Sequence, residues 1–175
     1  MAPPVTKKFK AKLTRSFENS GWHFLVIDRK IAEKFPTDGR TRRVTCSING
    51  CPPFQCALMP WGEIYYILVN KKRREELGLE VGDTVEVVLT EDRSKYGLPM
   101  PREFAEVLKQ DREGSKLFHS LTPGKQRSML YVIGNLKDID RRIHAGLTIL
   151  EHLKENHGKI DHSKLASELK RPVNW

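Results

Sequence analysis

A run of four basic residues, Lys71 to Arg74, opens a short segment that carries the signals of a helix. Asn70 is a favourable N-cap and Gly78 a favourable C-terminal residue, so a helix is predicted between them. The cations then lie at the positive end of the helix dipole, which is unfavourable by about 0.3–1 kcal/mol per exposed charge. Two interpretations stay open. The first turn binds an anion with its free N–H groups and side chains, or it is a solvated charged face.

Two further groups of cations lie elsewhere in the chain. One group is at the start of a predicted strand, and the other falls within two turns of a predicted helix. In the second group, Lys137 and Arg141 are four residues apart, so we expect them to share one side of the helix. A solvated, ion-paired face is the more common arrangement for such residues, and the alternative is that they face the barrel and help to form an anionic-ligand site between the domains. The candidate anion-binding residues are Lys71, Lys72, Arg73, Arg74, Arg42, Arg43, Lys137, Arg141 and Arg142.

No catalytic or metal-binding pattern stands out among the nucleophilic and metal-ligating residues. The cysteines lack a close CxxC pair, and the histidines near the carboxyl end are five residues apart, a spacing that does not keep them on one helix face. HExxH, phosphate-loop and GxGxxG patterns are absent from the sequence. We therefore predict no catalytic residue, no metal and no cofactor. The residues considered are Cys46, Cys51, Cys56, His152, His157 and His162.

The bulk composition favours anionic partners. The 175 residues include 31 basic and 22 acidic side chains, a formal net charge of +9. Such a surface attracts nucleic acid, phosphorylated ligands and anionic lipid headgroups and disfavours cationic partners. The first residues lack the apolar core of a secretory signal, and no run approaches the roughly 18 to 20 apolar residues that span a bilayer. Together with an odd number of cysteines, this predicts a cytoplasmic protein without membrane insertion. The sequence does not indicate its oligomeric state.

The first half of the chain has the pattern of a small β-barrel. Strands are predicted near residues 9–13, 22–27, 44–48, 54–58, 64–69 and 84–89, mostly from period-two alternation of apolar residues. Asn49-Gly50 is a strong turn signal between two of them, and Asp28 is expected to cap a short helix. The segment 64–69 is apolar almost throughout, which favours a central strand covered on both faces. An antiparallel barrel is the natural closure for so many short strands.

The second half changes to helical spacing. A polar segment with Gly97, Pro99 and Pro101 separates the halves, and we place the domains at residues 1–94 and 95–175. Two short helices are expected after Pro101, then a long helix over roughly 123–155 and a last one over 161–170. The predicted fold class is therefore α+β, a small antiparallel barrel followed by a helical appendage.

Several short motifs resemble the YdeI/OmpD-associated (OmdA-like) family of bacterial proteins, whose amino-terminal half is a domain of unknown function. The resemblance implies a double-split β-barrel followed by a helical part, with links to envelope stress or resistance to cationic peptides and no assigned biochemical activity. This sequence differs from the family in a basic cluster that is reduced to Arg141-Arg142 and in an extension after about His157. The matching motifs are Phe9-Lys10-Ala11-Lys12-Leu13, Trp22-His23-Phe24, Ile48-Asn49-Gly50, Leu58-Met59-Pro60, Leu77-Gly78, Gly82-Asp83 and Leu121-Thr122-Pro123.

These observations favour a non-catalytic module that binds an anionic ligand or nucleic acid. Two alternatives remain: an enzyme acting on a small anionic metabolite in a cleft between the domains, and a stress-response adaptor that binds protein. An exposed apolar patch on the carboxy-terminal helix would favour the adaptor. Trp22, Trp61, Tyr65 and Tyr66 could stack on bases, although aromatic residues in strands more often pack in the core.

Overall fold

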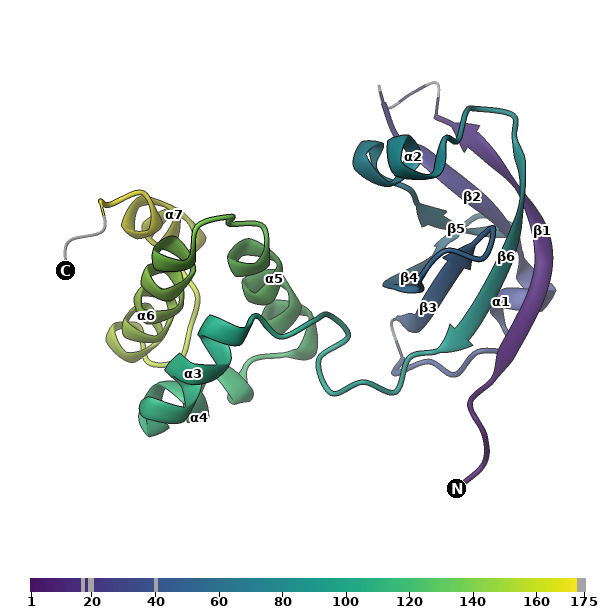
Figure 1. The fold of residues 1–175 in the computed structure, drawn as a ribbon. Helices are drawn as coiled ribbons and strands as arrows, with labels where there is room; N and C mark the ends of the chain where they lie inside the picture. The colour runs from purple at the N-terminus through teal and green to yellow at the C-terminus, as the bar shows by residue number, and fades with distance from the viewer. Residues whose placement is uncertain (17, 19–20, 40, 173–175) are drawn as a thin grey trace. The chain divides into compact units, whose positions relative to one another are not determined.

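Six antiparallel strands close into a barrel in the first of two units, Met1–Gly97 (Figure 1). The computed structural model describes residues 1–16, 18, 21–39 and 41–172. The strand order is β1-β2-β5-β4-β3-β6, and β6 pairs back onto β1. The predicted barrel is confirmed. Its strands are β1 Thr6–Arg15, β2 His23–Asp28, β3 Arg42–Ile48, β4 Phe54–Trp61, β5 Ile64–Leu68 and β6 Thr84–Glu91, with helices α1 Arg29–Ala32 and α2 Lys71–Leu77.

Alternate residues of each strand fill the barrel interior. The registers place Leu13 opposite Leu25 and Cys46 opposite Leu89, so that apolar side chains face one another inside. Removing each such side chain from water contributes about 1.5–3 kcal/mol. The completely buried strand residues are Leu13, Leu25, Ile27, Val44, Cys46, Ile48, Ile67, Val87 and Leu89.

Local capping and turn signals account for the connections. Asn49 and Gly50 both have positive φ, 50° and 75°, in the tight turn between β3 and β4. The Asp28 side chain accepts a hydrogen bond from the Lys30 backbone N–H at the start of α1. Asn70 caps α2 in the same way, and Gly78 ends it with φ 64°. These turns and caps are where the sequence predicted them.

Strand β5 corrects one expectation. It pairs with β2 and β4 on either side, but it is not covered on both faces. Ile67 lies inside the barrel with no exposed surface, whereas the next residue, Leu68, is 46% exposed. A closed sheet has only one interior, so the second apolar set of an all-apolar strand lies on the outer surface.

Five helices form the second unit, Leu98–Trp175, which is described here by itself. They are α3 Arg102–Gln110, α4 Arg112–Ser120, α5 Pro123–Gly134, α6 Ile139–Glu155 and α7 His162–Leu169. Phe104 of α3 and Phe118 of α4 meet edge to face, with ring centroids 5.1 Å apart. Leu130, Ile133 and Leu150 bury their side chains in the same core.

The predicted long helix over 123–155 is instead two helices. The break follows Gly134, a poor helix former, and the Asp138 side chain starts α6 by accepting from the Arg141 N–H. The Arg142 guanidinium donates to the carbonyls of Leu136 and Gly134. These bonds satisfy backbone groups that an uninterrupted helix would have paired internally, so the break is stable.

Gly146, by contrast, lies inside α6 without breaking it. Its lack of a side chain allows α3 to approach α6 closely at this point. A Cβ at this position would lie 2.9 Å from Cδ2 of the buried Phe104 ring. We expect Gly146→Ala to lower the free energy of unfolding by about 1–2 kcal/mol, since overpacking exceeds the gain of about 1 kcal/mol in helix propensity. Chemical denaturation followed by far-UV circular dichroism measures this difference.

Gly124→Ala is the matched control. A Cβ at Gly124 in α5 would meet only the Arg127 guanidinium, at 3.8 Å. Its stability should equal or slightly exceed that of the wild type. Equal stability of both variants would show that α3 and α6 do not approach as closely as described.

Candidate functional site

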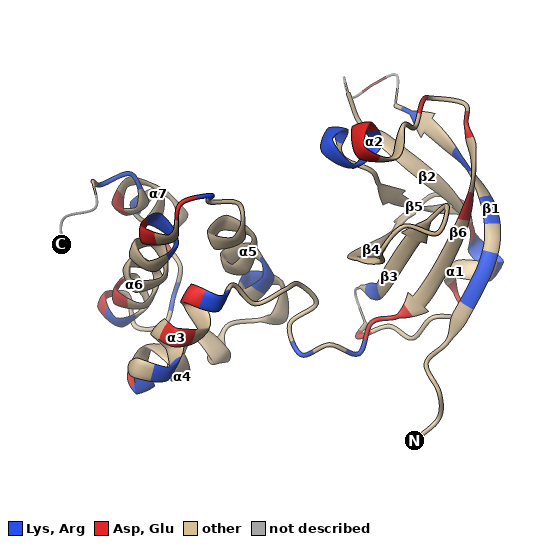
Figure 2. Cartoon of the chain, viewed as in Figure 1, with Lys and Arg blue, Asp and Glu red and all other residues tan. Residues whose placement is uncertain are grey.

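The basic first turn of α2 presents two of its four cations to solvent (Figure 2). The side chains of Lys71 and Lys72 are 80% and 86% exposed. Each lies near a carboxylate one turn further on, Glu75 at 3.8 Å and Glu76 at 3.9 Å. Exposed ion pairs of this length contribute little, because water and salt screen them. A phosphate group could therefore replace these carboxylates as the partner of the lysines at a small cost in free energy.

The other two cations of this turn are part of the fold. The Arg73 guanidinium lies 3.5 Å from the centroid of the Phe54 ring, a cation–π contact. Arg74 donates a hydrogen bond of 2.6 Å to the Val69 carbonyl. Both side chains therefore anchor α2 to the barrel, and of the four candidates only the two lysines extend freely from it.

Arg42 and Arg43, at the start of β3, are likewise engaged with the barrel unit. Arg42 donates to the Phe35 carbonyl and lies 6.0 Å from the ring of Tyr65. Arg43 donates to the Gly97 carbonyl at 2.7 Å. That either residue binds an anion stays a prediction.

Of the three candidate anion-binding residues in the second unit, Arg141 and Arg142 lie on α6 and Lys137 lies outside it. Lys137 lies in the connection between α5 and α6, so the expectation that it shares a helix face with Arg141 is wrong, because the helix begins only at Ile139. Arg141 lines a hollow of about 270 Å³ together with Lys170 and Arg171. The predicted ligand site between the domains stays a prediction.

Arg142 is a structural residue of the helical unit. Besides its bonds to the carbonyls of Leu136 and Gly134, 2.6 and 3.3 Å long, it forms an ion pair of 3.5 Å with Glu103 of α3. The side chains are 29% and 15% exposed, so this pair is shielded from solvent. Arg142 thus joins α3, α5 and α6.

An aromatic cluster on the outer face of the barrel is the feature that the sequence interpretation undervalued. Phe24, Trp61 and Tyr66 form a triangle of edge-to-face contacts, with ring centroids 5.7, 5.7 and 6.0 Å apart. Trp61 is 52% exposed and the adjacent Trp22 is 50% exposed. These four residues line a hollow of about 260 Å³. Of the four aromatics proposed for stacking, only Tyr65 packs against the barrel core.

Trp22, one of the rings that line this hollow, lies at the same end of β2 as the start of α2. Ser16 N–H donates to the Trp22 carbonyl at 2.9 Å, and Arg15 is opposite His23 in the β1–β2 pairing. Val69 N–H donates to the His23 carbonyl at 2.9 Å, and α2 begins two residues later. Backbone pairing therefore brings Arg15 and the first turn of α2 beside Trp22.

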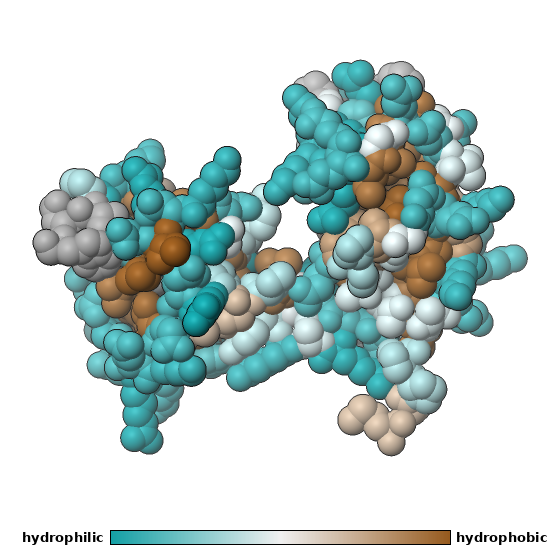
Figure 3. Space-filling view, in the orientation of Figure 1, coloured by the Kyte–Doolittle hydropathy of each residue, from teal (hydrophilic) through white to brown (hydrophobic). Residues whose placement is uncertain are grey.

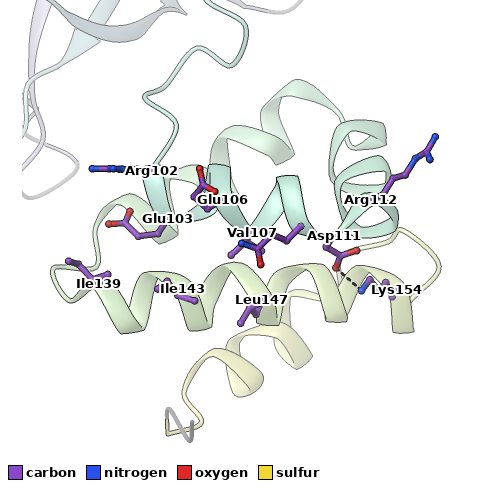
Figure 4. A pocket seen from close by; sticks show the side chains of 11 residues that line it. Arg102, Glu103, Glu106, Val107, Asp111, Arg112, Ile139, Ile143, Leu147 and Lys154 are labelled. Carbon is purple, nitrogen blue, oxygen red and sulfur yellow. Dashed lines mark ion pairs between the residues drawn. The ribbon is translucent and has the colours of Figure 1, made fainter.

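A groove lies between α3 and α6 of the helical unit (Figure 4). It has a volume of about 830 Å³. Ile139, Ile143 and Leu147, spaced four residues apart along α6, lie along it opposite Val107 of α3. A space-filling view shows a hydrophobic patch over α6 (Figure 3). The exposed apolar surface expected of a protein-binding adaptor is therefore present.

One ion pair crosses the groove at its far end. The Lys154 ammonium lies 2.6 Å from the Asp111 carboxylate, which also accepts from the Gly114 N–H at the start of α4. The hydrogen bond from Lys154 lowers the pKa of Asp111, and Asp111 with Glu151 raises the pKa of Lys154. The carboxylate is therefore held ionised and is unsuited to act as a general acid.

The cysteines occupy barrel positions. Cys46 is buried, and a hydrogen bond to Cys56 together with burial raises the pKa of its thiol, which disfavours the reactive thiolate. Over residues 1–16, 18, 21–39 and 41–172, no three His, Cys, Asp or Glu side chains are grouped as a metal site requires.

Two family models match the chain. Residues 9–89 match a domain of unknown function (DUF1905), and residues 98–156 match the family described as bacteriocin-protection, YdeI or OmpD-associated. The chain belongs to the YdeI/OmpD-associated family. The resemblance seen in the sequence motifs is confirmed by these matches. A comparison with curated proteins gives no match. None of the described helices of this YdeI/OmpD-associated chain is long and apolar enough to cross a membrane.

Helix α7 lies beyond the matched region of the YdeI/OmpD-associated family and is attached by a buried polar pair. His152 Nδ1 lies 2.8 Å from a Glu168 carboxylate oxygen, and His152 Nε2 accepts from the Asp161 N–H at 3.0 Å. Because Nε2 accepts, the ring proton lies on Nδ1 and is donated to Glu168. No local sequence signal marks this pair, since the residues are 16 positions apart.

Truncation of Arg142 tests its structural role. Arg142→Ala leaves the carbonyls of Gly134 and Leu136 and the Glu103 carboxylate without this partner, so we expect the free energy of unfolding of the helical unit to fall by about 2–4 kcal/mol. Thermal and chemical denaturation measure the change. Arg141→Ala, one residue earlier and exposed, should change stability by less than about 0.5 kcal/mol. Similar losses in both variants would contradict the assignment.

Acid titration tests the Asp111–Lys154 pair. Because its pKa is lowered in the folded state, Asp111 contributes stability that is present above its unfolded pKa of about 3.9 and is lost as the pH falls through the lower folded value. Asp111→Asn keeps an oxygen for the cap but removes the charge. The wild type should exceed the variant by on the order of 1 kcal/mol at neutral pH. That difference should vanish in acid; a difference independent of pH would exclude the ion pair as its source.

Proposed function

We propose that the barrel unit of this chain is a non-catalytic module that binds single-stranded nucleic acid on its outer aromatic face. The observation that carries the proposal is the pair of half-exposed tryptophans, Trp22 and Trp61, which line a hollow with Phe24 and Tyr66 on the outer face of the barrel, together with the exposed lysines at the start of α2. Aromatic side chains and cations together supply the two contacts that single-stranded nucleic acid offers, base faces and phosphates.

The aromatic rings are suited to stacking. The triangle of edge-to-face contacts holds the Trp61 ring in place while half of its surface is exposed, so a base can stack on it without displacing a packed neighbour. Trp22 forms the other side of the 260 Å³ hollow. Each base that stacks on such a ring contributes about 1–3 kcal/mol.

The neighbouring cations supply the phosphate contacts. Lys71 and Lys72 are exposed and only weakly paired, and Arg15 is exposed at the end of β1. The barrel unit itself is basic, with 17 basic and 12 acidic side chains in residues 1–97 against 14 and 10 in residues 98–175. Glu18 also lines the hollow, so the attraction of a polyanion rests on the net positive charge of the unit and on the exposed lysines of α2.

Binding is favoured over catalysis because the carboxylates that line the groove between α3 and α6 are held in ion pairs. Glu103 pairs with Arg142, Glu106 with Lys109 and Asp111 with Lys154. Catalytic acids at neutral pH need a raised pKa, and the pKa of Asp111 is shifted in the opposite direction.

Fluorescence titration with oligo(dT) tests the proposal. We expect the chain to bind the oligonucleotide with quenching of tryptophan fluorescence. Trp61→Ala should weaken binding by about 1–3 kcal/mol through the loss of a stacking surface. The Lys71→Ala, Lys72→Ala double variant should lower the slope of log K against log salt by about 0.7 for each phosphate contact removed.

Exposed residues of the helical unit provide the matched controls. Tyr131→Ala removes an aromatic ring that is 64% exposed on α5, and Lys125→Ala removes an exposed lysine of the same helix. Neither should alter the affinity or the salt slope. Absence of binding at low salt, or equal weakening by Tyr131→Ala and Trp61→Ala, would overturn the proposal.

A further inference from the structure

The groove between α3 and α6 exposes an apolar stripe that the helical unit itself does not cover. Ile139 is 61% and Leu147 39% exposed, although both are large aliphatic residues. With Ile143 between them, they form an i, i+4, i+8 row along one side of α6, about 12 Å long. This is the length over which a helix of two to three turns inserts its own apolar row.

When the ion pairs within the helical unit are set aside, the charges that remain around the groove are positive. All three carboxylates that line it have a cation within the unit: Arg142 for Glu103, Lys109 for Glu106, and Lys154 for Asp111. Two lining arginines, Arg102 and Arg112, have no ion pair with any residue in the described ranges.

The two arginines lie at opposite ends of the groove. Arg102 begins α3, which ends at Gln110, and Arg112 begins α4 after the non-helical Asp111. In Figure 4, Arg102 is drawn toward the Ile139 end of the apolar row and Arg112 toward the Lys154 end. The groove therefore has an apolar floor between two unpaired positive ends.

We propose that this groove binds an amphipathic helix of another protein, one that carries an apolar i, i+4, i+8 row with acidic residues near both ends of the row. The apolar row fills the floor, and the acidic residues pair with Arg102 and Arg112. A second copy of this chain is disfavoured as the occupant, because its groove would bring the same two arginines to the same two ends. The site is on the helical unit and does not depend on nucleic-acid binding by the barrel.

A synthetic helical peptide provides the probe. It carries leucine at every fourth position with glutamates at both ends and a fluorescein label, and a scrambled peptide of identical composition is the control. Fluorescence anisotropy with the full chain should show saturable binding of the amphipathic peptide and at least about tenfold weaker binding of the scrambled one. Salt should weaken the binding, because the end contacts are charged.

Variants of exposed residues locate the site without disturbing the core. Leu147→Asp and Ile139→Asp should each reduce affinity about tenfold or more. Tyr131→Asp, at a residue more exposed than either but on α5, is the matched control and should leave affinity unchanged. Unaltered thermal unfolding of each variant confirms that the helical unit is intact.

Charge reversal distinguishes pairing from a structural effect. Arg102→Glu should weaken binding of the acidic peptide and should be rescued by a peptide in which the glutamates at one end are replaced by lysine. Equal binding of the scrambled peptide, no binding of the amphipathic peptide, or failure of the rescue would overturn the proposal. A chain that dimerises in solution and becomes monomeric with Leu147→Asp would also overturn it, since a second copy would then occupy the groove.

Discussion

Closure of the six strands is the constraint on which the rest of the barrel unit depends. A closed sheet has one interior, and period-two alternation assigns each side chain either to it or to the outer surface. Where apolar and polar residues largely alternate, both demands are met, as in β6, where Val85, Val87 and Leu89 lie inside. Strands β2, β4 and β5 have apolar residues on both faces, so the barrel leaves Trp61, Tyr66 and Leu68 outside. The aromatic face is thus a direct consequence of closing a sheet whose strands are richer in apolar residues than its interior can accommodate.

Much of the fold was predictable because its signals are local. The Asn49-Gly50 turn, the Asn70 cap and the alternation of β1, β3 and β6 each involve residues a few positions apart. The family resemblance added the barrel type, which spacing alone does not specify. The errors came from long-range effects. The apolar periodicity continued across residues 135–138, and the break there depends on hydrogen bonds from Arg142 to the carbonyls of Gly134 and Leu136. The open face of β5 depends on barrel closure, and the buried pair of His152 and Glu168 depends on the docking of α7.

The sequence predicted which residues make up the candidate site, but not which of their side chains are exposed and which are engaged in contacts. The sequence located the cluster of cations, yet it could not show that Arg73 stacks on Phe54 and Arg74 binds the Val69 carbonyl while Lys71 and Lys72 remain exposed. Stacking aromatics were considered and judged more typical of a core, because exposure is a property of the assembled sheet. The two units also differ in what they present: the barrel combines rings with cations, and the helical unit combines an aliphatic row with two arginines. A chain with both surfaces has the physical means to join a polyanion to a protein partner.

Chemical-shift mapping of the full chain during titration with oligo(dT) tests the central claim most directly, because it reports every site at once without altering a residue. The account predicts that the changes concentrate on the indole N–H groups of Trp22 and Trp61 and the backbone amides of Lys71 and Lys72, while the α6 amides around Leu147 do not shift. Changes spread along the outer lysines of β1, or confined to the helical unit, would contradict it.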